Sequence, residues 1–223
     1  MYRYIVKFSK SGYIKYISHL DMMRLFKRSF KRLGIKLAYS QGYNPHPKMG
    51  LAQPLSLGYE SNGEILEFET VDKINDENIL KTFNLAMPEG IKILEFKEIE
   101  AAGKSLAAIT EFAEYRIKMP LKNNNEKAIE VLDFMHQTEI ISQKRNKKKE
   151  LVDLDIKSMI KELAINKNEE ELIIYVKLDA GSLSNLSPEL LIKAIAKYYQ
   201  LDYDRSEVEI TRETITFGNN LQI

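Results

Sequence analysis

The stretch Ser18-His-Leu-Asp-Met-Met-Arg-Leu-Phe-Lys-Arg-Ser-Phe-Lys-Arg-Leu-Gly34 decides the predicted fold, because it has the pattern of one amphipathic helix. Its apolar residues recur at spacings of three and four, which places them on one side of a helix: Leu20, Met23, Phe26, Phe30 and Leu33. Ser18 is the expected N-cap, with Asp21 three residues on as in a capping box, and Gly34 is the expected end. The stretch therefore predicts a helix with one apolar side.

Strand patterns around this helix predict the rest of a first domain. The expected order is strand, helix, strand, strand, helix, strand, and the further elements lie at Tyr2–Phe8 (extended by Tyr13–Ile17), Ile35–Tyr39, Glu64–Thr70, Asn75–Met87 and Ile91–Ile99. Ser61-Asn-Gly63 predicts a tight turn before the third strand. This βαββαβ order is that of the ferredoxin-like fold, whose right-handed crossovers place both helices on one face of an antiparallel sheet.

The pattern recurs after Ala101–Ser105, a segment small and flexible enough to be a linker. The expected elements are strands at Phe112–Met119, Glu139–Gln143, Leu151–Ile156, Glu171–Leu178 and Glu207–Phe217, and helices at Asn125–His136 and Ser187–Tyr199. The pattern of Ser158–Ile165 is ambiguous. We therefore predict an α+β protein of two tandem ferredoxin-like units, 1–105 and 106–223, with antiparallel sheets, helices on one face and a basic hairpin inserted in the second unit.

Positive charge is concentrated near the N-terminus. Residues 1–50 contain eleven Lys or Arg and a single acidic residue, Asp21, whereas the whole chain has 33 basic and 32 acidic residues and a net charge of +1. A cationic segment inside a nearly neutral chain suggests a site for an anion, and RNA is the first candidate.

The composition excludes several classes of chemistry. The chain has no cysteine, which excludes disulfides, thiolate metal sites, cysteine-held iron–sulfur clusters and cysteine nucleophiles. It contains no P-loop, dinucleotide fingerprint or Gly-x-Ser-x-Gly elbow, and we predict no cofactor and no metal. No stretch resembles a signal peptide or approaches the ~18 to 20 apolar residues of a membrane span, so we expect a cytoplasmic protein without a membrane partner.

Five cations occupy the polar side of the predicted helix: Arg24, Lys27, Arg28, Lys31 and Arg32. Such an array suits phosphates, because each neutralised phosphate releases a counterion. The alternative is a solvated outer face, but solvated faces normally mix both signs, and this one has no acidic residue after Asp21. We therefore expect these side chains to bind an anion.

The next segment, Ser40-Gln-Gly-Tyr-Asn-Pro-His-Pro-Lys48, predicts a rigid loop. Pro45 and Pro47 fix their own φ angles and bias the residues before them toward extended backbone, and Gly42 permits a positive φ. Side chains that could contact RNA are the hydrogen-bonding Gln41, Asn44 and His46, the cation Lys48, and the rings of Tyr39 and Tyr43, on which bases could stack. The alternative is a structural loop that covers the edge of the sheet.

Two histidines in this region, His19 and His46, are the candidate catalytic residues. His19 lies in the first helical turn, where it is either a general base or a capping and packing residue. Asp21 is a cap by the same argument, or it orients a cation such as Lys48. The separation of the two histidines matches no compact set of metal ligands.

A second basic cluster lies in the predicted hairpin of the second domain, at Lys144, Arg145, Lys147, Lys148 and Lys149. Runs of this kind are usually exposed turns. If the two domains pack side by side, the hairpin would extend the cationic surface, and Lys144, Arg145, Lys147 and Lys148 are therefore candidate RNA contacts.

Several motifs in the first third of the chain resemble those of a known bacterial family. They are Tyr16-Ile-Ser-His-Leu-Asp-Met-Met-Arg24, Phe30-Lys-Arg-Leu-Gly34, Ala38-Tyr-Ser-Gln-Gly-Tyr-Asn-Pro-His-Pro-Lys48 and Pro54-Leu-Ser-Leu-Gly58. Together they are similar to the bacterial radical SAM-linked family, whose function is unknown. The resemblance implies a radical SAM protein as partner and supplies no catalytic residues.

Three functions remain open from the sequence. The preferred one is a non-catalytic RNA-binding module that assists a radical SAM partner in modifying or processing tRNA or rRNA. The second is a metal-independent ribonuclease that uses His19 or His46, with the cationic helix stabilising the transition state. The third is an adaptor that binds the radical SAM protein without contacting RNA.

Overall fold

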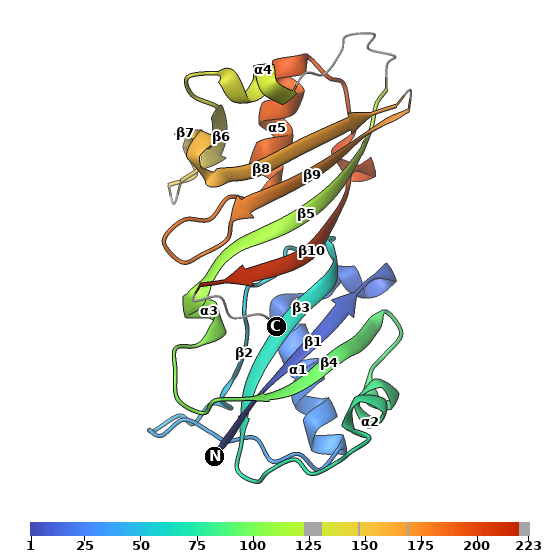
Figure 1. Ribbon diagram of the computed structural model, residues 1–223, viewed down its shortest axis with the longest axis vertical. Helices are drawn as coiled ribbons and strands as arrows, with labels where there is room; N and C mark the ends of the chain where they lie inside the picture. The colour runs from blue at the N-terminus through green and yellow to red at the C-terminus, as the bar shows by residue number, and fades with distance from the viewer. Residues whose placement is uncertain (123–130, 147, 169, 219–223) are drawn as a thin grey trace. The chain divides into compact units, whose positions relative to one another are not determined.

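The protein is a mixed α+β structure with antiparallel sheets, seen in a computed structural model that describes residues 1–122, 131–146, 148–168 and 170–218 (Figure 1). The chain forms two compact units. Unit 1 comprises Met1–Thr110 and the residues from Thr214 on, and unit 2 comprises Glu111–Glu213.

Unit 1 is built on a sheet in which β1 (Tyr2–Lys10) lies between β4 (Ile91–Ile99) and β3 (Glu60–Thr70). Both pairings are antiparallel, and the short β2 (Met49–Leu51) pairs antiparallel with β3. The helical elements are η1 (Gly12–Tyr16), a 3₁₀ turn, and α1 (His19–Arg32), α2 (Ile79–Ala86) and α3 (Leu106–Ile109).

Unit 2 has a sheet in the order β10, β5, β9, β8 and a separate two-stranded hairpin. Its strands are β5 (Thr110–Pro120), β6 (Ile141–Arg145), β7 (Leu151–Asp155), β8 (Ile160–Lys167), β9 (Glu171–Asp179) and β10 (Glu209–Phe217). The helical elements are α4 (Val131–His136), η2 (Lys157–Met159), α5 (Pro188–Tyr199) and η3 (Arg205–Glu207). β9 pairs antiparallel with β5 and with β8, and β6 with β7.

Helix α1 begins where the sequence predicts, at the Ser18 cap. The Ser18 hydroxyl oxygen accepts a hydrogen bond from the Asp21 backbone N–H (3.1 Å), and the hydroxyl donates to the Asp21 carboxylate (2.7 Å). The same carboxylate pairs with Arg24 (2.9 Å). The helix ends before Gly34, whose φ of +70° is the left-handed conformation expected after a C-cap.

An aromatic core attaches α1 and α2 to one face of the sheet of unit 1. Phe26 and Phe30 of α1 and Phe83 of α2 are completely buried, together with residues of β1, β3 and β4 that point to the same face: Tyr4, Val6, Phe8, Leu66, Phe68 and Ile93. Ring centroids lie 4.4 Å apart for Phe30 and Phe68, and 4.9 Å apart for Phe8 and Phe26. Truncating one of these rings to alanine typically costs ~3–5 kcal/mol.

The opposite face of the same sheet carries a second apolar cluster. Ile5 and Ile65 pack there with Leu106 of α3 and with Ile215 and Phe217 of β10. The last residues of β10 therefore complete the core of unit 1, while its first residues belong to unit 2.

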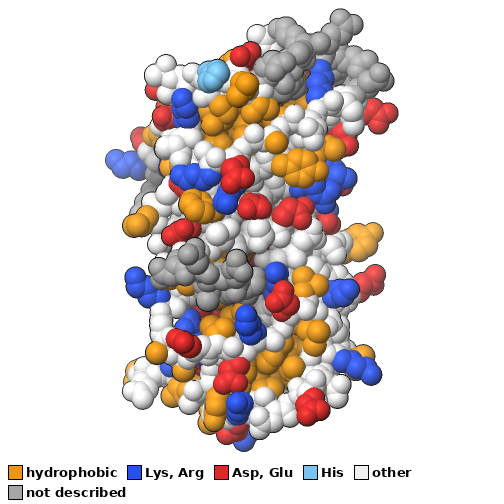
Figure 2. Space-filling view, viewed as in Figure 1, with side chains coloured by type: hydrophobic (Ala, Val, Ile, Leu, Met, Phe, Trp, Pro, Cys, Tyr) orange, Lys and Arg blue, Asp and Glu red, His pale blue; other side chains and the backbone are white. Residues whose placement is uncertain are grey.

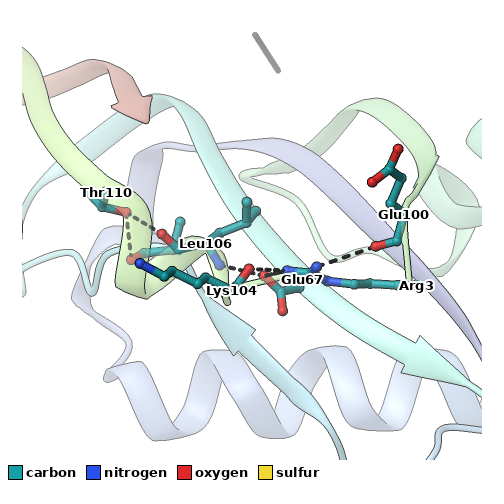
Figure 3. A network of polar contacts seen from close by, with 7 residues as sticks. Arg3, Glu67, Glu100, Lys104, Leu106 and Thr110 are labelled. Atoms are coloured by element: carbon teal, nitrogen blue, oxygen red, sulfur yellow. Dashed lines mark hydrogen bonds and ion pairs between the residues drawn. The ribbon is translucent and has the colours of Figure 1, made fainter. Parts of the chain in front are cut away.

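A largely buried ion pair holds the predicted linker onto this second face (Figure 3). Arg3 pairs with Glu67 (3.0 Å) and donates to the carbonyl oxygens of Lys104 (2.7 Å) and Glu100 (3.3 Å). Glu67 in turn accepts from the Leu106 backbone N–H (2.7 Å) at the start of α3. Residues 100–106 are thus tied to the sheet.

Several predicted elements of the first domain are wrong in detail. Tyr13–Ile17 is not a strand extension, because Gly12 takes a positive φ (+66°) and starts η1. Ile35–Tyr39 forms no strand and makes only isolated bridges, because β2, directly after the predicted Ser40–Lys48 loop, takes the pairing with β3. The predicted turn Ser61–Gly63 lies within β3, where Ser61 faces Lys10 of β1.

Burial on α1 also differs from the prediction. Leu20 is 64% exposed, whereas Met22 is buried. Helix α2 is shorter than the predicted Asn75–Met87. In unit 2 the ambiguous Ser158–Ile165 contains the end of η2 and most of β8, and part of the predicted helix Asn125–His136 lies outside the described residues.

Asp21 gives a pH-dependent prediction. The pKa of its carboxyl is lowered, first by the hydrogen bond from Ser18 and then by the one from Arg24. Because the folded-state pKa lies below the unfolded value of about 3.9, the ionised carboxylate stabilises the fold above that pH, and the effect is lost as pH falls through the folded-state pKa. We expect Asp21→Asn to lower the midpoint of thermal unfolding at neutral pH and to leave it unchanged at about pH 2.

The control is Glu139→Gln, which alters an exposed carboxylate that makes no hydrogen bond or ion pair within the described residues. It should leave the midpoint unchanged at both pH values. A difference for Asp21→Asn that persists at low pH would show that the side chain acts through its shape and not through its charge.

Gly90 gives a steric prediction. It has a φ of +89°, and a Cβ there would lie 2.5 Å from the Ser11 carbonyl oxygen and 2.8 Å from Ile14 Cγ2. At Gly34 the φ is also positive, but no atom lies within 4 Å. We expect Gly90→Ala to cost several kcal/mol and Gly34→Ala about 1–2 kcal/mol in urea unfolding. Equal losses at the two sites would contradict the close contact between Gly90 and the turn at Ser11.

Candidate nucleic-acid interface

The five cations selected from the sequence all lie on the exposed side of α1, opposite Phe26 and Phe30. The sheet face opposite α1 has a different character. In Figure 1 α1 lies behind the sheet of unit 1, and the near face of that unit in Figure 2 mixes basic and acidic side chains. The mixture of signs on that near face contrasts with the five cations on the exposed side of α1.

These cations differ in the contacts that their side chains make. Arg24 pairs with Asp21, and both side chains are exposed. Arg32 donates to the carbonyl oxygen of Ala86 (2.5 Å), the last residue of α2, and so stabilises the end of that helix. Among the described residues, the side chains of Arg28 and Lys31 make no hydrogen bond or salt bridge, and Arg28 acts on Asp21 only through its charge, which helps to lower the pKa of that carboxyl. These two are the cations most available to a ligand.

Lys27 connects α1 to the proline-containing loop. Its Nζ lies 6.0 Å from the centroid of the Tyr39 ring, within the range of a cation–π contact. The helix spacing of ~100° per residue places Lys27 near the edge of the cationic face that meets the loop, and Arg32 near the edge that meets α2. The helix face and the base of the loop are therefore parts of one surface.

The loop is closed by hydrogen bonds at its base. The Ser40 N–H donates to the His46 carbonyl oxygen (2.8 Å), the His46 N–H donates to Ser40 Oγ (3.0 Å), and Tyr39 bridges Pro47. Gly42 has the predicted positive φ, at +132°. Between these anchors the side chains of Gln41, Tyr43, Asn44 and His46 are exposed, Tyr43 completely so.

Lys48 is engaged within the protein. Its ammonium pairs with Glu69 of β3 (2.8 Å) and not with Asp21, the alternative that the sequence left open. It is therefore less available to a ligand than Arg28 or Lys31.

The two histidines are not brought together by any described contact. His19 is the first residue of α1, whereas the loop base meets α1 at Lys27, ~12 Å further along the helix axis. The cavity beside His19 has a volume of about 10 Å³, room for about one water molecule. His46 is exposed, and its backbone closes the loop.

The second basic cluster belongs to unit 2, at the turn between β6 and β7. Asn146 organises this turn, because its side-chain oxygen accepts hydrogen bonds from the N–H groups of Lys148 and Glu150. Arg145 donates to the Lys149 carbonyl oxygen (2.9 Å), and Lys144 is exposed. Lys147 lies outside the described residues.

Sequence reasoning missed two surface features of unit 1. One is an open groove of about 690 Å³ between α1 and the end of α2, lined by Leu25, Arg28, Lys31, Arg32, Leu85, Ala86, Met87 and Pro88. The other is η1, which carries the exposed Tyr13 and Tyr16. Ser11-Gly12 was the available signal for the second, since a glycine after a strand often marks a turn.

The described part of the chain contains no cluster of three or more His, Asp or Glu side chains that could hold a metal ion. In the same residues, no helix combines the length and apolar character needed to cross a membrane.

Comparison with known proteins gives a fold likeness and a family. No curated protein matches the chain. A chain in the crystal structure of a Cbf5-Nop10-Gar1 complex is similar, with a TM-score of 0.51 and 13% identity over 94% of this chain, and this chain spans 47% of its length. At that identity the likeness concerns the fold alone.

A second solved structure, an unknown protein from Galdieria sulphuraria, matches with 10% identity over 95% of this chain and 98% of that one, at a TM-score of 0.28. Residues 3–188 match a protein family described as uncharacterised and conserved in bacteria, DUF2344. That match covers both the α1–loop surface and most of unit 2, and the chain therefore belongs to this bacterial family.

Proposed function

We propose that the protein is an RNA-binding module and that unit 1 holds the RNA on the surface formed by α1 and the loop. The observation that carries the proposal is the exposed cationic face of α1, on which Arg28 and Lys31 have no hydrogen-bond or ion-pair partner among the described residues. Unpaired, exposed cations of one sign on a rigid helix are what a phosphate backbone requires.

The loop supports RNA over a simple anion. Tyr39 and Tyr43 offer ring faces, and Gln41 and Asn44 offer amides, on a segment whose closed base limits the ordering entropy that binding must overcome. A simple anion would contact the cations and would make no contact with the tyrosine rings. A ribonuclease that uses His19 or His46 has less support, because no described contact brings the two histidines together as an acid–base pair.

The fold proposal extends to both units. We infer that residues 1–105 and 106–223 are tandem ferredoxin-like units. In support, the order β4-β1-β3 with β2 beyond β3 matches the order β10-β5-β9-β8, if β5 is taken as the first strand of its unit. In both cases the first strand lies between the fourth and the third, as in a βαββαβ sheet.

The partner proposal rests on the motifs alone. The resemblance of Tyr16–Arg24, Ala38–Lys48 and Pro54–Gly58 to the radical SAM-linked family supports a radical SAM protein that modifies or processes the bound RNA, tRNA or rRNA, in the cytoplasm. In this arrangement the chain would contribute RNA binding and no chemistry of its own.

Charge reversal tests the RNA proposal. The variant Arg28→Glu/Lys31→Glu removes the two unpartnered cations and leaves Arg32, which stabilises α2. We expect it to bind a tRNA or rRNA fragment at least about tenfold more weakly at low salt. The slope of log affinity against log salt should fall by about 1.4, because each phosphate contact with a single strand contributes about 0.7.

The matched control is Lys193→Glu/Lys197→Glu, which reverses two exposed lysines on α5 in unit 2. It makes the same change in net charge and should retain nearly the wild-type affinity. Equal weakening by both variants would show that net charge, and not the α1 surface, determines binding. Unchanged affinity in the α1 variant would refute the proposed interface.

A further inference from the structure

The turn between β1 and α1 presents two aromatic rings to solvent. In η1, Tyr13 is 95% exposed and Tyr16 is 64% exposed. Burying a tyrosine ring is favourable, and rings left outside a core are commonly used for recognition. Leu20, in the first turn of α1, is also 64% exposed, so the apolar surface here extends beyond the tyrosines. We therefore consider which ligand would contact these exposed rings.

The backbone of this turn is fixed by side chains from the sheet. Lys10 is only 4% exposed, and its ammonium donates to the carbonyl oxygens of Lys15 (3.2 Å) and Ile17 (3.5 Å). Withdrawing an ammonium group from water is costly unless hydrogen bonds replace the lost solvent, and the two carbonyls do so here. The Gly12 N–H donates to Glu60 (3.1 Å), which also pairs with Lys15 (3.5 Å).

Two other segments hold the same turn. The Gly58 N–H donates to the Lys15 carbonyl oxygen (3.0 Å), and the Ser11 N–H donates to the Gly90 carbonyl oxygen (2.9 Å). Lys10 and two segments that are remote in sequence, at residues 58–60 and at Gly90, thus fix the shape of η1. Its tyrosines are presented by a preformed backbone, and binding to them costs little ordering entropy.

A cation accompanies the tyrosine rings at both places where unit 1 exposes them. Lys15 Nζ lies 5.6 Å from the centroid of the Tyr16 ring, as Lys27 Nζ lies 6.0 Å from that of Tyr39. At Tyr39 the ring can stack on a base while Lys27 meets the phosphate. Lys15 also pairs with Glu60, so in η1 the rings themselves supply the contact with a base.

We propose that unit 1 recognises unpaired bases, with Tyr13 and Tyr16 as stacking platforms in addition to the loop tyrosines. This inference rests on the proposed RNA function and narrows its ligand to single-stranded or looped-out RNA. Bases of an A-form duplex are stacked on one another, so their faces cannot reach a tyrosine ring. The α1 cations would then serve any RNA, and the rings would select unpaired segments.

The test compares three ligands in fluorescence anisotropy: a uridine RNA of about 12 nucleotides, a duplex RNA of the same length, and inorganic polyphosphate of similar charge. Wild-type protein should bind the single strand at least about fivefold more tightly than the duplex. Tyr13→Ala and Tyr16→Ala should each weaken single-strand binding by about 5- to 100-fold and leave polyphosphate binding unchanged.

Two controls accompany the alanine variants. Tyr16→Phe keeps the ring and should keep the affinity, which separates stacking from the hydroxyl group. Tyr175→Ala removes a half-exposed tyrosine on β9 of unit 2 and should have no effect. Thermal unfolding of each variant establishes that the comparison concerns folded protein.

The outcomes separate the two proposals. Equal binding of single strand and duplex, or unchanged single-strand binding in Tyr13→Ala and Tyr16→Ala, would overturn the stacking role and leave RNA binding intact, with the rings assigned to a protein partner. Folded wild-type protein that binds polyphosphate but neither RNA, or none of the three ligands, would overturn the proposed function and this inference with it.

Discussion

The packing of Phe26 and Phe30 against the sheet is the constraint on which the candidate interface depends. Because these rings are buried against Phe8, Phe68 and Phe83, α1 cannot rotate about its axis without opening the core. Every other position on the helix is then fixed in direction. The cations face solvent, Lys27 meets the loop, and Arg32 meets the end of α2, as consequences of apolar packing on the opposite side.

The sheet of unit 1 packs against different elements on its two faces, because successive residues of β1 point to opposite faces. Tyr4, Val6 and Phe8 hold the helices, while Ile5 faces α3 and the end of β10. Charged groups on this strand are engaged in structure: Arg3 ties residues 100–106 to the sheet, and Lys10 fixes η1. The positive charge of the first fifty residues is thus partly structural, and the part on α1 is the most available to a ligand.

Sequence reasoning succeeded where local periodicity decides the structure. The spacing from Met23 to Leu33, the Ser18 cap and Gly34 were sufficient to place α1 and the exposed side of its cations. It failed where the local structure depends on a group that is distant in the sequence. Tyr13–Ile17 looked like a strand because the pattern does not show Lys10 reaching the carbonyls of the turn, and Ser61–Gly63 looked like a turn because its pairing with Lys10 is not local. The ion pair between Lys48 and Glu69 could not be predicted for the same reason.

The position of Ile215 and Phe217 has a consequence for synthesis. These residues complete the second face of the unit 1 core, yet they are the last described strand residues of the chain. A ribosome therefore releases them only after all of unit 2 has been made. Until then Ile5 and Ile65 lack part of their cover, so unit 1 cannot finish folding first during translation, and the two units should reach their final state together.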